Sequence, residues 1–144
     1  MKLLTLIILS LVIISCSEST EEYLVSQWGI QEMSFKGEAI EETFLSNLFI
    51  LEENNICEVP IILNDDDILK DNRIGKWSFD VANNLLTIES QNPYLDGVFK
   101  ICFEKNLEYK RIMLIMESKD VFVKASKGLT QYRGSGGKLP IECK

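Results

Sequence analysis

The sequence predicts an all-β domain, a small barrel or sandwich of about seven or eight strands. Two observations carry this prediction. Residues 76–90, KWSFDVANNLLTIES, separate into one apolar and one polar face if they form a hairpin. Other short apolar stretches recur at roughly regular spacing, with polar turn residues between them, and only one stretch has helical spacing.

The hairpin in residues 76–90 is the clearest element. Asn83-Asn84 suits a two-residue turn, because asparagine tolerates the left-handed conformation that such a turn requires. This turn pairs Phe79 with Ile88 and Val81 with Leu86. One face then carries Trp77, Phe79, Val81, Leu86 and Ile88, and the other carries Ser78, Asp80, Thr87 and Glu89. A single register therefore buries one face and leaves the other in water.

The N-terminal half of the domain supplies an opening strand and a second hairpin. The opening strand covers residues 27–35. Residues 38–48 have apolar side chains at helical spacing, which predicts a short helix or a loop. Residues 48–51 and 56–62 flank the polar stretch EENN, which predicts a turn. Pro60 marks the second of these strands as an edge strand or as the site of a bulge.

The C-terminal half continues the same pattern. Residues 97–104 alternate between two faces, with Phe99, Ile101 and Phe103 on one and Lys100, Cys102 and Glu104 on the other. Residues 111–117 and 121–125 are apolar and flank a polar turn at 118–120. These segments predict three further strands, the last two forming a hairpin.

The first 15 residues have the features of an export signal. Lys2 precedes an apolar run over residues 3–14, which is too short to cross a hydrocarbon core that needs roughly 20 helical residues. Ile13-Ile14-Ser15-Cys16 resembles the lipobox of bacterial lipoproteins. In that family the cysteine receives a diacylglyceryl group, the peptide is cut before it, and the new N-terminus is acylated, for example with palmitate.

The resemblance implies that Cys16 is a lipidation site and that the protein is anchored to a membrane. Each buried methylene contributes about 0.8 kcal/mol, so two or three acyl chains hold a protein firmly. One alternative is a plain signal peptide, which would leave Cys16 an ordinary thiol, and another is a retained membrane-spanning segment. We expect an outer-membrane lipoprotein of the cell envelope, on the periplasmic face or the cell surface.

We expect four parts along the chain. They are a lipoprotein signal peptide at 1–15, a lipidated flexible tether at 16–22, the β domain at 23–133, and a Gly-rich tail at 134–144. The full chain has a net charge of −7, and removal of Lys2 with the signal makes it one unit more negative. Such an acidic domain lacks the surplus of basic residues that nucleic acid requires, so nucleic acid is not an expected partner.

The residue types present argue against an enzyme. The chain contains no histidine. This excludes Ser-His-Asp and Cys-His catalysis in their usual form and removes the commonest ligand of transition metals. Asn64-Asp65-Asp66-Asp67 is a concentrated set of oxygen ligands, and it could form a weak calcium site, but a solvated loop is the preferred interpretation. We therefore expect no catalytic residue, no cofactor and no metal.

Three cysteines remain after Cys16. In an oxidising compartment, one disulfide and one leftover thiol are expected among Cys57, Cys102 and Cys143. Strand alternation predicts that Cys57 points inward and Cys102 outward. An outward cysteine is the easier partner for a tail that wraps the surface, which favours Cys102–Cys143, although three pairings are open.

Two tryptophan motifs lie at strand starts. Trp28-Gly29 lies near the start of the opening strand, and Gly75-Lys76-Trp77 begins the central hairpin. With the lipobox, the spacer and the later strand pairs, the chain resembles the lipocalin-like, calycin-type lipoproteins of didermal bacteria. The resemblance implies an antiparallel up-and-down barrel of about eight strands, closed at one end by the first-strand tryptophan. That family has the order G-x-W, which is matched here at Gly75 and Trp77 rather than at Trp28.

Two functions follow from such a barrel. In the first, a hollow monomeric barrel binds a small apolar or amphipathic ligand, such as a lipid. The aromatic residues expected to line its cavity are Trp28, Phe49, Trp77, Phe79, Phe99 and Phe103. In the second, the interior is packed, and exposed loops at 63–73 or the tail at 134–144 engage an envelope protein as an interaction or inhibitor module.

Overall fold

The computed structural model describes residues 19–63, 73–128 and 138–144. Within these ranges it contains a short helix, α2 (Thr20–Leu24), and a 3₁₀ helix, η1 (Glu41–Thr43). The strands are β1 (Ser26–Phe35), β2 (Glu38–Ala39), β3 (Leu48–Leu51), β4 (Ile56–Glu58), β5 (Ile74–Asp80), β6 (Leu85–Glu89), β7 (Gly97–Asn106), β8 (Arg111–Glu117) and β9 (Val121–Gly128).

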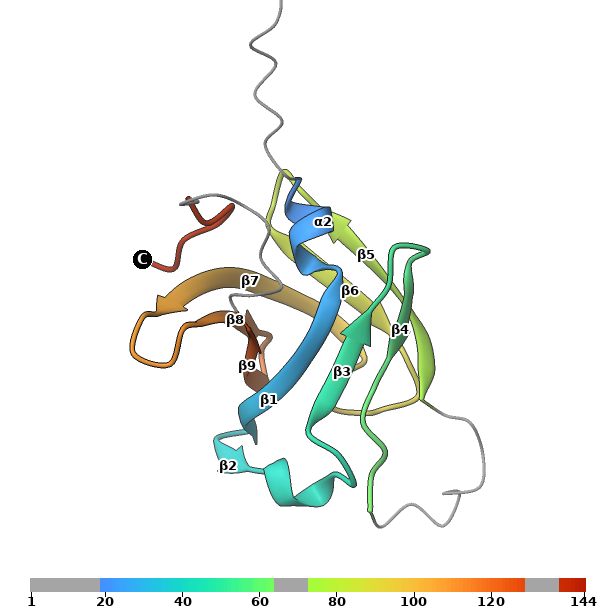
Figure 1. The fold of residues 1–144 in the computed structure, drawn as a ribbon. Coiled ribbons are helices and arrows are strands. Elements are labelled where there is room, and N and C mark those ends of the chain that lie inside the picture. The colour runs from blue at the N-terminus through green and yellow to red at the C-terminus, as the bar shows by residue number, and fades with distance from the viewer. Residues whose placement is uncertain (1–18, 64–72, 129–137) are drawn as a thin grey trace, which may run out of the picture.

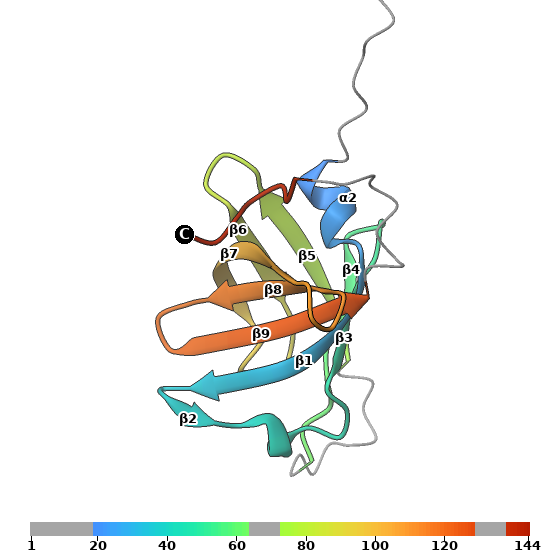
Figure 2. The same ribbon diagram turned by 60° about the vertical axis from the view of Figure 1, so that its left-hand side comes forward.

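Eight of these strands close an antiparallel barrel in the order β1-β3-β4-β5-β6-β7-β8-β9, and β9 pairs back onto β1 (Figure 1 and Figure 2). β2 is a short extra strand on the edge of β1. Neighbouring barrel strands follow one another along the chain, except that β2 lies between β1 and β3 in the sequence and outside the barrel. The predicted fold class, an antiparallel up-and-down barrel with one short helix, is confirmed.

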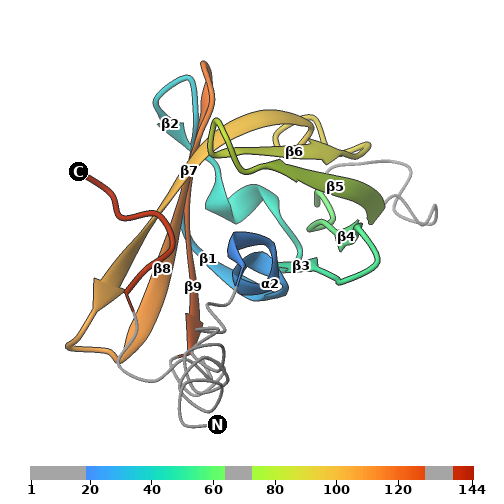
Figure 3. The same ribbon diagram turned by 90° about the horizontal axis from the view of Figure 1, so that it is seen from above.

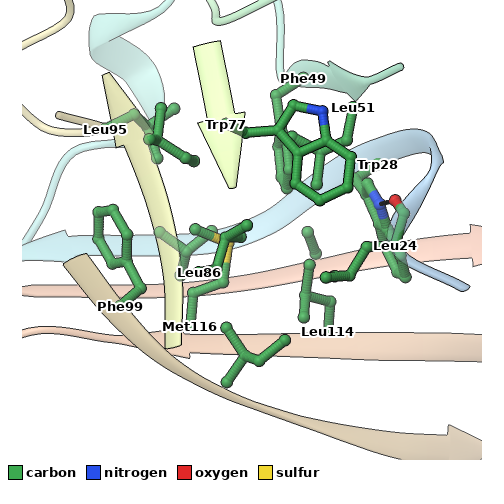
Figure 4. Close-up of a cluster of buried hydrophobic side chains, with 14 of the residues drawn as sticks. Leu24, Trp28, Phe49, Leu51, Trp77, Leu86, Leu95, Phe99, Leu114 and Met116 are labelled. Atoms are coloured by element: carbon green, nitrogen blue, oxygen red, sulfur yellow. Dashed lines mark hydrogen bonds between the residues drawn. The ribbon is translucent and has the colours of Figure 1, made fainter. Parts of the chain in front are cut away.

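Strand alternation builds the barrel wall. In β5, Trp77 and Phe79 are buried, whereas Lys76, Ser78 and Asp80 face solvent. β7 likewise buries Phe99, Ile101 and Phe103 at alternate positions, as the period of two residues requires. The inward side chains form a single apolar cluster in the centre of the barrel (Figure 4).

The turn of the β5–β6 hairpin differs from the predicted two-residue turn. Phe79 pairs with Leu86, and Asp80 pairs with Leu85, so residues 81–84 form a four-residue turn. The Asp80 carboxylate accepts hydrogen bonds from the backbone N–H of Ala82 and from the backbone and side chain of Asn83. These bonds stabilise the longer turn, and the predicted register is therefore wrong by two residues.

The two-residue shift leaves most of the hairpin's faces as predicted. Trp77, Phe79, Leu86 and Ile88 still point inward, because a shift by two keeps each side chain on its own side of the sheet. Val81 is the exception. It lies in the turn and is 63 % exposed.

The second predicted hairpin is formed by β3 and β4. Residues 52–55 make its turn, and Leu51 pairs with Cys57. β4 is shorter than predicted, because it ends at Glu58 and Pro60 lies beyond it.

Helix α2 covers one end of the barrel (Figure 3). Its N-terminus carries a capping box, in which the Ser19 hydroxyl accepts from the Glu22 N–H and the Glu22 carboxylate accepts from the Ser19 N–H. Tyr23 and Leu24 are buried against the core. Residues 20–22 therefore belong to an ordered helix, in contrast to the flexible tether predicted for 16–22.

The opposite end is covered by two segments that pack through aromatic rings. Tyr94 contacts Phe35 and Phe44 edge to face, with ring centroids 5.4 and 5.9 Å apart. Asn92 is buried, and its side-chain amide donates to the Pro60 carbonyl at 3.0 Å. The stretch 38–48, predicted as a short helix or loop, contains β2 and η1 and supplies Phe44 to this end.

The C-terminal residues are fixed to the outside of β7. A disulfide joins Cys102 to Cys143, as the sequence favoured. Beyond residue 100, β7 leaves β6, and its backbone at Phe103 instead pairs in parallel with residues 141–143. Cys57 is a free, buried thiol on the inner side, and Cys102 points outward, also as predicted.

Candidate functional site

The six residues predicted to line a cavity all belong to the central cluster. None exposes more than 9 % of its surface, and Trp28 and Phe49 are fully buried. Figure 4 shows Trp28, Phe49 and Trp77 near one another and Phe99 further away within the same cluster. Trp28 and Phe103, for example, have ring centroids 6.2 Å apart. The structure therefore brings these residues together as packed core.

Two hollows lined by described residues open to the surface of the barrel. One, of about 640 Å³, lies between the outer face of β7–β9 and the C-terminal residues. Another lies between α2 and the β3–β4 turn and includes the acidic residues Glu21, Glu22 and Glu53. We call these the tail groove and the acidic hollow.

The tail groove combines an apolar floor with charges of both signs. Ile115, Phe122 and the Cys102–Cys143 disulfide contribute apolar surface. Its charged side chains are Lys100, Lys124, Lys144, Glu104, Glu117 and Glu142. Lys124 Nζ lies 3.7 Å from a Glu104 carboxylate oxygen, a half-exposed pair of modest strength. An apolar centre with a mixed polar rim is typical of a protein-binding surface.

A buried lysine beneath α2 was missed by the sequence analysis. Lys127 is 6 % exposed, and its ammonium lies 4.1 Å from the centroid of the Tyr23 ring and 4.8 Å from that of Trp28. The ammonium also donates to the Tyr23 carbonyl, and Trp28 Nε1 donates to the Leu24 carbonyl at 2.9 Å. Trp28 thus lies beneath α2, in contact with the helix and with Lys127.

The alternation in β9 could have identified this lysine. Val121, Val123 and Ala125 point inward, so Lys127 falls at the next inward position. A positive charge at an inward position indicates a specific partner, because burying an unpaired charge is costly.

The G-x-W match at Gly75 and Trp77 is explained by packing. A Cβ atom at Gly75 would lie 2.5 Å from the Glu89 carbonyl oxygen and 3.0 Å from Cys57 Sγ. Trp77 Nε1 donates to the Glu52 carbonyl at 2.9 Å, which fixes the indole beside the β3–β4 turn. Glycine therefore allows the close approach of β4 and β6 to β5.

Cys57 and Glu41, whose side chains are of types that can serve in catalysis, have structural surroundings here. Burial raises the pKa of the Cys57 thiol to about 11, so this sulfur is protonated and shielded from reagents. Glu41, one of two adjacent acids in η1, accepts from the Met33 N–H at 2.7 Å and so has a structural partner. Within the described ranges, no group of three or more acidic or thiol side chains could hold a metal ion.

Several predicted features lie outside the described residues. They are the lipidation site Cys16, the acidic cluster at 64–67 and the glycine-rich part of the tail at 134–137. Neither helix of the described chain is long and apolar enough to span a membrane. Comparison with protein-family models, with curated proteins and with solved structures finds no match.

Proposed function

We propose that this protein is a lipoprotein of the cell envelope, anchored through Cys16, whose packed barrel presents its outer surface to a protein partner. The observation that carries the proposal is the burial of the six aromatic residues expected to line a cavity, which all belong to one hydrophobic core cluster. Both ends are covered as well, one by α2 and the other by Phe35, Phe44 and Tyr94.

The proposed contact surface is the tail groove. Its apolar floor and mixed charges suit a protein surface better than an acyl chain, which needs an apolar cavity with few charges. The disulfide supports this role, because it fixes one wall of the groove to β7.

The competing function is binding of a small apolar or amphipathic ligand inside the barrel. Native mass spectrometry separates the two on the chain Ser19–Lys144, which contains every described element. The packed barrel predicts a mass equal to that of the bare chain with one disulfide. A reproducible extra mass that is lost on denaturation would overturn the packed-barrel proposal and identify the class of ligand.

The partner surface is tested by photo-crosslinking in producing cells. A photoreactive residue at Phe122, in the tail groove, should give one discrete cross-linked species, and Lys124→Glu should abolish it. The matched control is Leu45, which is 61 % exposed and does not line the tail groove. Equal cross-linking from both positions would contradict a role for the tail groove.

Anchoring is tested separately by metabolic labelling with palmitate. The full chain should incorporate label, and Cys16→Ala should not. Label that persists in the Cys16→Ala variant, or its absence from the unchanged chain, would refute the lipid anchor while leaving the packed barrel untouched.

A further inference from the structure

The turn between β7 and β8 exposes apolar side chains to an unusual degree. Leu107 is 77 % exposed and Tyr109 is 65 % exposed, the two highest values among the large apolar residues that the structure describes. The turn is well defined, since the Tyr109 N–H donates to the Asn106 side chain at 3.1 Å. Turns in contact with water usually carry small or polar residues, so Leu107 and Tyr109 indicate a contact.

The charge of this turn is opposite to that of the chain. Residues 105–111, KNLEYKR, contain three basic residues and one acidic residue, whereas the chain has a net charge of −7. The acidic hollow lies on another side of the same end, where Glu21, Glu22 and Glu53 gather. An anionic surface would therefore attract the β7–β8 side of this end and repel the side of the acidic hollow.

The turn and α2 share one end of the barrel. Arg111 pairs with Asn106 in β7 and with Gly128 in β9, while Gly29 pairs with Ser126. The end of β7, the start of β8, the end of β9 and the start of β1 therefore belong to the end of the barrel that α2 covers, and the β7–β8 turn projects outward from it (Figure 3). Ser19 is three residues after Cys16. A chain of that length reaches at most about 10 Å, so an anchor on Cys16 would hold this end near the membrane.

We infer that the β7–β8 turn docks onto the headgroup region of the bilayer that holds the anchor. Leu107 and Tyr109 would enter the interface, where tyrosine is favoured, and Lys110 and Arg111 would contact lipid phosphates. The inference rests on the proposed lipidation of Cys16. Because the anchor keeps the turn close to the lipid, a contact too weak to bind a free protein is sufficient.

The test uses the lipidated full chain in vesicles of phosphatidylethanolamine and phosphatidylglycerol whose acyl chains carry bromine, a quencher of tryptophan. Tyr109→Trp places a reporter in the turn, and Leu45→Trp places one of similar exposure at the opposite end. Trp28 and Trp77 are buried and supply a common background. We expect loss of the added emission for Tyr109→Trp and none for Leu45→Trp. Adding Lys110→Glu and Leu107→Ser to Tyr109→Trp should restore the added tryptophan emission, because these changes remove the contacts with lipid.

Flotation with the vesicles separates failure of the inference from failure of the anchor. If the protein floats but the Tyr109→Trp emission persists, or if Leu45→Trp is quenched to the same extent, the docking contact is wrong and the anchor stands. If the unchanged chain does not float, both the anchor and the docking contact are refuted.

Discussion

Lys127 shows how a single residue fixes the closed end of the barrel. Its ammonium lies against two aromatic rings and donates to a backbone carbonyl of α2. A cation–π contact contributes about 2 kcal/mol where the cation is desolvated. We expect Lys127→Met to lower the free energy of unfolding by about 2–3 kcal/mol, because methionine fills the space but makes neither contact.

Urea denaturation followed by circular dichroism measures this change. The matched control is Lys124→Met, three residues earlier in β9, where the lysine points outward and pairs with Glu104 at 3.7 Å. That variant should lose less than about 1 kcal/mol. Equal losses in the two variants would show that the rings beneath α2 do not stabilise the lysine.

Cys57 gives the stability a specific dependence on pH. Its pKa is raised from the ordinary value of 9.0 to about 11 by burial, so the unfolded chain loses this proton first as pH rises. The protonated thiol's contribution to stability is complete below pH 9.0 and is lost as pH rises toward 11. In that window the free energy of unfolding should fall by about 1.4 kcal/mol per pH unit on account of this group.

Comparison with Cys57→Val isolates the effect, because other groups titrate in the same range in both proteins. The slope of unfolding free energy against pH between 9 and 11 should be smaller in the variant. Parallel slopes would mean that the thiol is not shielded in the folded protein.

At the scale of elements, the C-terminal segment and its disulfide cover the part of β7 that β6 leaves. The bond closes a loop with a sequence separation of 41 residues. Loop-closure entropy for that length corresponds to about 4 kcal/mol. We expect Cys143→Ser to lower the unfolding free energy by up to about 4 kcal/mol, measured by urea denaturation.

The same variant carries a second readout at this edge. In the intact protein, the Phe103 N–H donates to the Ile141 carbonyl, with the nitrogen 2.7 Å from the oxygen. Hydrogen exchange of the Phe103 amide should become much faster in this variant. Protection of this amide in Cys143→Ser would show that the segment stays in place without its covalent bond.

The strands and α2 show which structural features can be predicted from sequence patterns and which cannot. The apolar positions of β5 and β7 follow directly from alternation, and so does the outward direction of Cys102. The β5–β6 register was wrong because turn length depends on the hydrogen bonds of Asp80, which alternation does not encode. The tether predicted for 16–22 overlooks the capping box Ser19-x-x-Glu22, which precedes the buried Tyr23 and Leu24.

For the whole molecule, the sequence predicted a barrel but left open whether it is hollow. Aromatic residues on the inner wall are compatible with either state, because the free volume depends on how side chains from opposite strands meet. Phe99 illustrates this: alternation places it inward, while its 1 % exposure follows only from the neighbours packed around it. The direction in which a strand side chain points can be predicted from neighbouring residues in the sequence. How tightly the inward side chains pack depends on the whole closed barrel.

A packed interior predicts a large penalty for deleting a central ring. Phe99→Ala should lower the unfolding free energy by about 3–5 kcal/mol, because it removes buried surface and leaves a void. Thermal and urea denaturation give the value, and the control is Val98→Ala, on the outer face and 51 % exposed. A loss below about 1 kcal/mol for Phe99→Ala would indicate that the ring borders open space and would favour the ligand-binding barrel.

The pairing of β1 with β9 has a consequence for how the chain folds. Gly29 meets Ser126 across this seam, about a hundred residues along the chain, and loop closure over such distances slows folding. The barrel cannot close until β9 is available to pair with β1. A chain that crosses a membrane from its N-terminus would therefore remain open, with the edges of β1 and β8 unpaired, until nearly all of it had emerged. Assistance from a chaperone would be most valuable during that interval.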